Sequence, residues 1–438
     1  LQWWAVERRQ EWKPPFSPSY SWTGIGNFLA NIIHVIFVIS LGDSPTNRKL
    51  CVGVAGKVWL AFAKVGGHGI LLAMTFVARS SRKRTLTNAP LIDAITPGVR
   101  EQRRAVWFMR QAGRSLPEYR QVRAGIDMLD SCFMSELLAE ITLQPVRRHD
   151  VDAAILFSDI VVPLKAAGVD VEIVSGRGPV VAQPILSMSD VDKLPVLDSD
   201  IDGVMAGIGI IIDNLTSSQA LIGFAGAPFT LASYLVEGGP SRNHEKTKAM
   251  MHAQPETWHA LMRKLTPTIT HFLSMQISAG IDAMQLFDSW AGFLTERDYR
   301  EYVLPYSMEI FAAIAGAGIP RIHFGVGTGE LLGAMSQAGA DVTGVDWRVP
   351  LDVAARRIHH AVGPKSVQGN LDPALLCAGE EVVRAEAARI CAEADRAISA
   401  GHAIGHIFNL GHGVLPTTDP EMITRAVSLV HEITPPQI

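Results

Sequence analysis

The sequence is poor in cysteine and in charge, and it has no excess of basic residues. Its four cysteines are scattered over 438 residues without a C-x-x-C pair, which argues against a disulfide scaffold or a structural zinc site and favours a reducing compartment. Charged residues make up 19 % of the chain and the formal net charge is −4, so a generally basic, nucleic-acid-binding surface is excluded. The hydrophobic fraction of 48 % is enough for a sizeable core and excludes wholesale disorder.

Motifs for nucleotide cofactors and for hydrolysis are also missing. The glycine-rich string Gly325–Gly329 does not fit G-x-G-x-x-G, because Glu330 occupies the position of the third glycine. The chain contains no P-loop, no H-E-x-x-H and no G-x-S-x-G. Nucleotide binding, zinc-dependent proteolysis and serine hydrolase chemistry therefore have no support.

The composition changes near residue 85. Residues 1–85 contain 11 Lys and Arg against three Asp and Glu, and five of the nine tryptophans, whereas residues 86–438 contain 28 basic against 40 acidic residues. We therefore expect residues 1–85 to be an N-terminal extension unrelated to the catalytic domain, which would occupy residues 86–438.

The extension contains two apolar runs, Phe28–Leu41 and Val52–Ala78, followed by the basic, acid-free stretch Ala78–Asn88. The first run is shorter than the roughly 20 apolar residues that a membrane span needs. We prefer an upstream translation or loosely ordered extension, with Met74 as a candidate start. A membrane anchor and a targeting segment remain alternatives.

From residue 100 onward, short apolar runs alternate with longer amphipathic stretches, which is typical of βα units in a parallel sheet. Helices are expected at Ser135–His149, Pro255–Ala279, Gly329–Ala338 and Glu380–Ala400, and a β-hairpin insertion over Val169–Ile185 after the second strand, with its turn at Ser175–Gly178. Eight units predict an α/β fold, a (β/α)₈ TIM barrel, with an open doubly wound sheet as the alternative. The eight predicted strands are Ala105–Met109, Ala153–Phe157, Ala220–Phe224, Ala283–Phe287, Arg321–Phe324, Asp341–Val345, Lys365–Gln368 and His402–Phe408.

In such a barrel the functional groups lie where the strands end, and polar or glycine-rich residues follow almost every run. Arg110 and Arg114 stand four apart across Gly113, and two guanidinium groups on one loop suit a polyanionic ligand, although surface salt bridges would explain them equally well. Asp159 follows the second run, where a carboxylate either anchors a turn or accepts hydrogen bonds from ligand N–H groups.

Three further candidates are hydrogen-bonding side chains. Tyr234 and Ser289 carry hydroxyl groups, which serve in ligand binding or simply as caps and turns. His412 is flanked by Gly411 and Gly413, which would let a ligand approach the backbone. A lone histidine is more often structural, but after the last strand a functional role and a structural role have nearly equal support.

These residues lie in motifs that resemble those of the uroporphyrinogen decarboxylase family, in the expected order over roughly residues 86 to 435. The most specific is Val106–Tyr119 (VWFMRQAGRSLPEY). The others are Phe157–Ile160 (FSDI), Gly226–Leu231 (GAPFTL), Tyr234–Gly239 (YLVEGG), Phe287–Gly292 (FDSWAG), Gln368–Pro373 (QGNLDP) and Asn409–Gly413 (NLGHG).

The resemblance implies a cytoplasmic (β/α)₈ enzyme of porphyrin and haem biosynthesis, usually a homodimer whose active-site clefts face each other. It implies conversion of the four acetate groups of uroporphyrinogen III into methyl groups, giving coproporphyrinogen III and CO₂ without a metal or organic cofactor. It also implies the site residues: Arg110 and Arg114 for substrate carboxylates, the backbone of Gln111, Ala112 and Gly113 close by, Asp159 for the pyrrole N–H groups, and Tyr234, Ser289 and His412 to complete the pocket.

Two rival functions follow from the same residues. Zinc-dependent methyltransferases of the same superfamily bind zinc through a His-x-Cys pair, but the corresponding stretch His323–Gly325 has no thiolate. A membrane-attached tetrapyrrole-binding protein would use the N-terminal apolar runs as an anchor. We expect neither a metal site nor stable membrane association.

Overall fold

The computed structural model describes residues 61–65, 68–72, 84–99, 101–113 and 115–436, which belong to two compact units divided between Ala78 and Arg79. In the first unit, β1 (Ala61–Val65) pairs antiparallel with β2 (His68–Leu72). The run Phe28–Leu41, most of Val52–Ala78, and Met74 lie outside the described residues. In the part of the chain that the structure describes, no helix has the length and hydropathy to cross a membrane.

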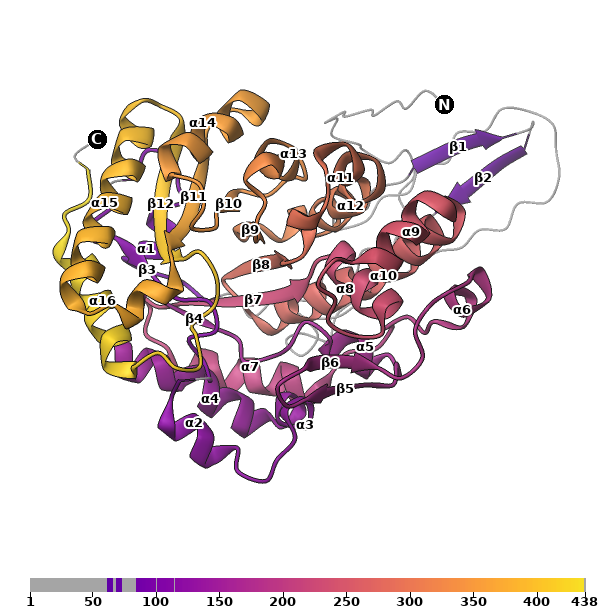
Figure 1. The fold of residues 1–438 in the computed structure, drawn as a ribbon, viewed down its shortest axis with the longest axis horizontal. Helices are drawn as coiled ribbons and strands as arrows, with labels where there is room; N and C mark the ends of the chain where they lie inside the picture. Colours follow the sequence, from indigo (N-terminus) through magenta and orange to yellow (C-terminus); the bar gives the residue numbers. More distant parts are fainter. Residues whose placement is uncertain (1–60, 66–67, 73–83, 100, 114, 437–438) are drawn as a thin grey trace, which may run out of the picture. The chain divides into compact units, whose positions relative to one another are not determined.

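The second unit is built around eight parallel strands, and the predicted (β/α)₈ barrel is confirmed (Figure 1). Each predicted run overlaps one strand, although β7, β8, β9, β11 and β12 extend past the predicted ends. The strands pair in the order β3-β12-β11-β10-β9-β8-β7-β4. The open doubly wound sheet is therefore wrong. The strands are β3 (Ala105–Val106), β4 (Ala153–Ile155), β7 (Ala220–Gly226), β8 (Ala283–Asp288), β9 (Arg321–Gly325), β10 (Val342–Gly344), β11 (Lys365–Leu371) and β12 (Ala403–Leu410).

The two short strands β3 and β4 complete the ring through side chains as well as backbone. The Asp152 N–H donates to the Val106 carbonyl oxygen (2.9 Å), and the Asp152 carboxylate accepts from the Val106 N–H (2.8 Å). The buried Gln111 amide accepts from the Phe108 N–H (2.8 Å) and donates to the Ala153 carbonyl oxygen (2.9 Å). These bonds satisfy backbone groups that two- and three-residue strands would otherwise leave unpaired.

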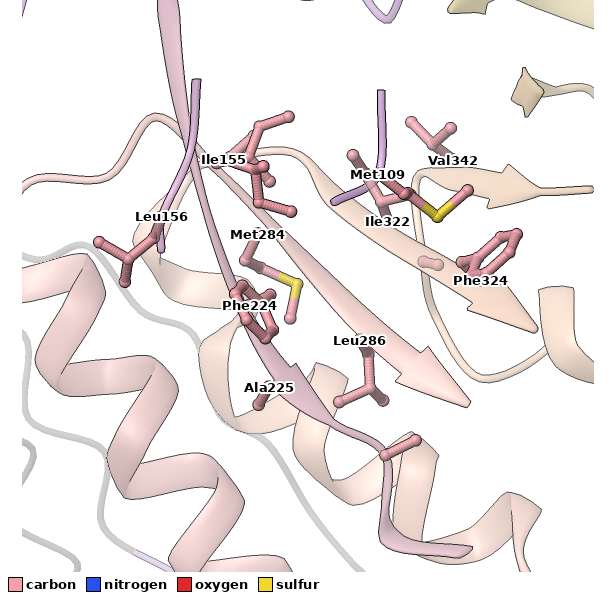
Figure 2. Packing of buried hydrophobic residues seen from close by; sticks show 14 of the residues in the cluster. Met109, Ile155, Leu156, Phe224, Ala225, Met284, Leu286, Ile322, Phe324 and Val342 are labelled. Atoms are coloured by element: carbon pink, nitrogen blue, oxygen red, sulfur yellow. The ribbon is translucent and has the colours of Figure 1, made fainter. Parts of the chain in front are cut away.

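Helices and short turns surround the strands, and apolar side chains such as Phe224, Met284 and Ile322 pack inside (Figure 2). The predicted helices at Ser135–His149 and Pro255–Ala279 have the same bounds in the structure, whereas the third predicted helix begins as a 3₁₀ turn. The helices are α1 (Pro90–Asp93), α2 (Pro117–Val122), α3 (Met128–Phe133), α4 (Ser135–His149), α5 (Val162–Ala166), α6 (Met188–Lys193), α7 (Asp202–Asn214), α8 (Pro228–Glu237), α9 (Glu245–Ala253), α10 (Pro255–Ala279), α11 (Glu296–Tyr302), α12 (Leu304–Ile314), α13 (Leu332–Ser336), α14 (Leu351–Val362), α15 (Glu380–Ser399) and α16 (Pro420–Glu432). The 3₁₀ turns are η1 (Ala291–Phe293), η2 (Ala315–Ala317), η3 (Gly329–Leu331) and η4 (Pro373–Cys377).

A chain of hydrogen bonds between buried side chains, one tryptophan and two glutamines, crosses the barrel interior. The indole N–H of Trp107 donates to Gln368 Oε1 (3.2 Å), and Gln368 Nε2 donates to Gln285 Oε1 (2.8 Å). All three side chains are buried. The interior is therefore a packed core with one polar line through it.

The predicted hairpin insertion is also present. Strands β5 (Val171–Val174) and β6 (Gly178–Val181) pair antiparallel after the second barrel strand, with the turn in the predicted place.

The start of the barrel unit is anchored by an ion pair. Arg84 pairs with Asp282 (2.7 Å), and both side chains are largely buried.

We predict that Gln111→Leu lowers the free energy of unfolding by about 2–4 kcal/mol, because the Phe108 N–H and the Ala153 carbonyl would lose their partner while remaining buried. Urea unfolding of the full chain measures this. The exposed Gln121→Leu is the matched control, expected to change stability by less than about 0.5 kcal/mol. Equal stability of the two variants would show that Gln111 does not hold β3 to β4.

Candidate active site

A cavity of about 800 Å³ lies at the carboxyl ends of the barrel strands. Its lining includes seven of the nine residues that the sequence singled out: Arg110, Ala112, Gly113, Asp159, Tyr234, Ser289 and His412. Gln111 does not line it, because its side chain is bonded into the barrel wall. Arg114 lies outside the described residues.

Asp159 is the acidic side chain among the residues that line this cavity. It follows β4, and one of its carboxylate oxygens accepts the Val161 N–H (3.0 Å), which fixes the turn into α5. Burial raises the pKa of Asp159, while the Val161 and Ile160 backbone bonds and the positive charge of Arg110 act in the opposite direction. N–H donors from a ligand would further favour the ionised form.

Arg110 lies in the loop that follows β3, in a left-handed backbone conformation (φ +60°). Its side chain extends across Gly413, where a Cβ would lie 2.5 Å from Arg110 Cδ, so only glycine leaves this path open. The Arg110 side chain is exposed and makes no hydrogen bond or ion pair with any other described residue. Its guanidinium is thus available for a carboxylate.

His412 is a neutral hydrogen-bond donor. Its Nδ1 accepts the Gly413 N–H (2.7 Å), which leaves the proton on Nε2. Burial, and then the positive charges of Arg110 and Arg348, lower the pKa of His412 to about 4. The ring stacks on Trp347, with ring centroids 6.5 Å apart and an interplanar angle of 14°.

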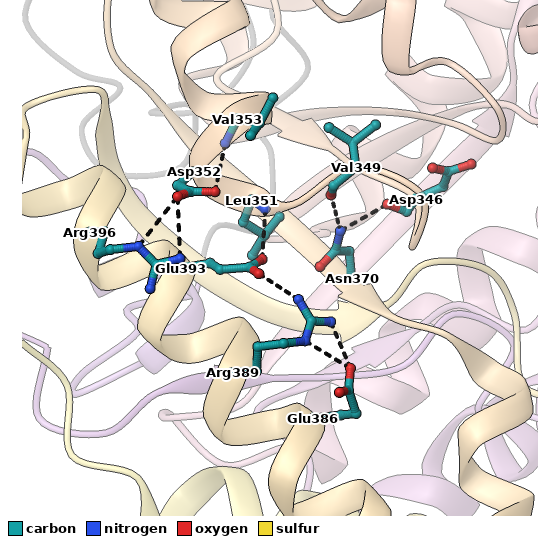
Figure 3. Close-up of polar contacts among 10 residues, drawn as sticks. All are labelled: Asp346, Val349, Leu351, Asp352, Val353, Asn370, Glu386, Arg389, Glu393 and Arg396. Atoms are coloured by element: carbon teal, nitrogen blue, oxygen red, sulfur yellow. Dashed lines mark hydrogen bonds and ion pairs between the residues drawn. The ribbon is translucent and has the colours of Figure 1, made fainter.

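The loop that carries Trp347 is held by buried polar contacts (Figure 3). Asn370 Nδ2 donates to the carbonyl oxygens of Asp346 (2.9 Å) and Val349 (2.7 Å). The Asp346 carboxylate accepts from the Gly327 N–H (2.5 Å) and pairs with Arg348 (2.5 Å). The ends of β9, β10 and β11 are thereby tied together behind His412.

Tyr234 and Ser289 occupy neighbouring parts of the wall. The Tyr234 ring, on α8, lies with its centroid 4.0 Å from the Trp290 ring, and burial followed by the charge of Asp159 raises the Tyr234 pKa. Thr230 Oγ1 donates to the buried Asp288 carboxylate (3.0 Å) and accepts the Trp290 N–H (3.3 Å), which fixes the turn bearing Ser289. Tyr234 therefore keeps its phenolic proton at neutral pH, and the backbone that carries Ser289 is held in place.

The structure also adds residues that sequence reasoning left unassigned. The tip of the β5–β6 hairpin lines the cavity with Ser175, Gly176, Arg177 and Gly178. The sequence signal was a basic residue between two glycines in the predicted turn, but nothing in it located the turn at the cavity. Trp347, behind His412, was missed in the same way.

The fold and the cavity define a (β/α)₈-barrel enzyme whose site combines a carboxylate for N–H donors with a free guanidinium and neutral hydrogen-bond donors. Residues 87–433 match the family model described as uroporphyrinogen decarboxylase (URO-D). The chain belongs to the uroporphyrinogen decarboxylase family, as its motifs predicted.

Relatives named uroporphyrinogen decarboxylase include those of Corynebacterium diphtheriae, 72 % identical over 342 residues (78 % of this chain and 98 % of that protein), and Rhodococcus erythropolis, 66 % identical over 361 residues (82 % and 100 %). Among solved structures, a methyltransferase from Methanosarcina mazei is similar with a TM-score of 0.62 and 16 % identity, covering 79 % of this chain and 99 % of that chain. At that identity the likeness concerns the fold alone.

We predict that His412 stays neutral from pH 8 down to about pH 5, since its lowered pKa of about 4 places its protonation well below the ordinary value of 6.5. The imidazole signal, assigned by its loss in His412→Gln, should be constant over that range in an NMR titration and move only near pH 4. A midpoint near 6.5 would contradict the buried, cation-flanked environment described above.

Proposed function

We propose that this chain removes the four acetate carboxyls of uroporphyrinogen III as CO₂, leaving methyl groups and giving coproporphyrinogen III in porphyrin and haem biosynthesis. The observation that carries the proposal is the convergence of Asp159, Arg110, Tyr234, Ser289 and His412 on one cavity at the strand ends. Family membership over residues 87–433 supports the same reaction.

The electron sink for this reaction is the substrate's own pyrrole ring. Protonation of a ring carbon gives a cation, and the bond to the acetate carboxyl then breaks with its electron pair moving into the ring system as CO₂ leaves. Protonation of the resulting methylene carbon gives the methyl group, and loss of the proton from the ring carbon restores the pyrrole, so that one proton is consumed for each CO₂ released. Ionised Asp159, beside the pyrrole N–H groups, stabilises positive charge that appears only along this path.

The remaining residues bind and orient. Arg110 and Arg114 hold substrate carboxylates, with the backbone of Gln111, Ala112 and Gly113 close to them. Arg110 has no carboxylate paired with it among the described residues, so we assign it to binding before proton transfer, because a lone guanidinium is a poor acid. Tyr234, Ser289 and the Nε2–H of His412 complete the hydrogen-bonding wall.

We propose no metal or organic cofactor, because the ring itself accepts the electrons. Within the described ranges, no three His, Cys, Asp or Glu side chains lie close enough to hold a metal ion. His323, the position expected to bind zinc in the rival methyltransferase, is fully buried, with its Nδ1 3.4 Å from the Met335 carbonyl oxygen.

We further propose that residues 86–438 form the catalytic unit and that residues 1–85 are an extension, whose last part is joined to the barrel unit through Arg84 and Asp282. We also propose that the protein works as a cytoplasmic homodimer without nucleic-acid or membrane partners. The range of the family match and the scattered cysteines support these points. Sedimentation analysis of the purified full chain tests the dimer.

We predict that Asp159→Asn lowers kcat at least about 100-fold, because an amide keeps the shape but supplies no charge to the cationic intermediate. Product chromatography after anaerobic incubation measures this. Asp192→Asn, an exposed change of the same kind on α6, is the control and should retain wild-type kcat. Near-normal turnover by Asp159→Asn would remove Asp159 from the mechanism.

We predict that the full chain, incubated anaerobically with uroporphyrinogen III, produces a ladder of products from eight carboxyls down to four, unchanged by EDTA. Chromatography of the oxidised products resolves the ladder. If folded protein gave no such ladder, the proposed reaction would be overturned. Loss of the ladder in EDTA, restored by zinc, would favour the zinc-dependent alternative.

A further inference from the structure

Arg177 lies at the tip of the β5–β6 hairpin and lines the catalytic cavity. Its N–H donates to the Val174 carbonyl oxygen (3.0 Å), which closes a tight turn. The two residues beside it, Gly176 (φ +73°) and Gly178 (φ +96°), adopt the left-handed conformation that favours glycine. The turn thus presents one long cationic side chain between two residues that have none.

The hairpin is anchored to the wall of the active site. The Val181 N–H donates to the Gly238 carbonyl oxygen (3.1 Å), and the Ile185 N–H donates to that of Leu235 (2.9 Å), so β6 and the segment after it are bonded to the end of α8 (Figure 1). Val171 and Val181 are buried at the base of the hairpin. Since α8 also carries Tyr234, the hairpin is held in a fixed relation to one of the proposed substrate-binding residues.

The guanidinium of Arg177 is unused within the described protein. The side chain is exposed and has no hydrogen bond or ion pair with any other residue that the structure describes. It lies beside Gly239, where a Cβ would come within 3.7 Å of Arg177 Nη2. An arginine with no partner among the described residues, presented by a tight turn at a cavity, has its hydrogen-bonding capacity free for a ligand.

The charges of the cavity indicate that the group bound by Arg177 is a carboxylate. Among the described residues that line it, the permanent cations are Arg110 and Arg177, and Asp159 is the acid. His412 adds no charge at neutral pH, because its pKa is about 4. A substrate with eight carboxylates needs more cationic partners than the loop after β3 supplies, and a planar guanidinium binds a carboxylate through two parallel hydrogen bonds.

We propose that Arg177 binds a peripheral carboxylate of the tetrapyrrole, one that is not being removed in that round of reaction. This inference rests on the proposed function and assigns to the hairpin a part in substrate affinity. The reacting acetate lies near Asp159, so the bond to Arg177 is the same before and during bond cleavage. Such an interaction lowers KM and leaves kcat unaltered.

The test compares the full-length wild type with Arg177→Gln, Arg177→Lys and Arg242→Gln, using uroporphyrinogen III. We expect Arg177→Gln to raise KM about five- to tenfold with kcat within about twofold of wild type, and Arg177→Lys to lie between them. Arg242 is exposed and does not itself line the cavity, although its neighbours Pro240 and Ser241 do, so Arg242→Gln controls for the loss of one positive charge near the opening. Thermal unfolding checks that all variants are folded.

Two results would overturn the inference. An unchanged KM in Arg177→Gln, or an equal rise in Arg242→Gln, would show that Arg177 makes no specific contact. A fall in kcat with KM unchanged would place Arg177 at the reacting group rather than at the periphery. Inactivity of the wild type would overturn the proposed function instead, so the two failures are distinguishable.

Discussion

The buried carboxylate of Asp152 and the amide of Gln111 join β3 to β4, and the positions of Arg110 and Asp159 depend on that junction. Both strands are too short to hold the barrel closed by a regular ladder alone, so side chains supply bonds that backbone supplies elsewhere. The carboxylate of Asp152 is itself held by His431 (3.1 Å) and by Arg103. A shift at this junction would separate the guanidinium loop from the acid that it faces.

Among the described residues that line the cavity, only Arg110, Arg177 and Asp159 carry charge at neutral pH. Burial and two nearby guanidinium groups keep His412 neutral, so it donates a hydrogen bond without adding to the positive potential. The positive charge is then confined to arginines, whose protonation does not vary over any physiological pH. Asp159 meets its counter-charge on the substrate, where the proposed mechanism creates it. This arrangement suits the polyanionic substrate of the proposed reaction and places one negative charge where that reaction develops a positive one.

Much of the architecture could be predicted from sequence because each strand lies in a short apolar run, and polar or glycine-rich residues follow almost every run. The bounds were harder to predict: Ala105–Met109 was predicted as one strand, but β3 ends at Val106, since the chain then turns to place Arg110 at a positive φ. Gln111 lies in the binding motif by sequence, yet its amide faces the wall, because periodicity does not reveal which backbone groups lack partners. The hairpin turn was predicted from its glycines, whereas its location beside the cavity depends on bonds to α8 that no local pattern encodes.

The hydrogen-bonded chain of Trp107, Gln368 and Gln285 also determines where small molecules can enter and leave the barrel. Together with the apolar side chains around it, this chain fills the barrel below the cavity, so the strands do not enclose a tunnel. In the proposed reaction, CO₂ formed near Asp159 has no exit through the barrel axis and would leave through the cavity opening by which the substrate enters, so one opening would serve both substrate and product.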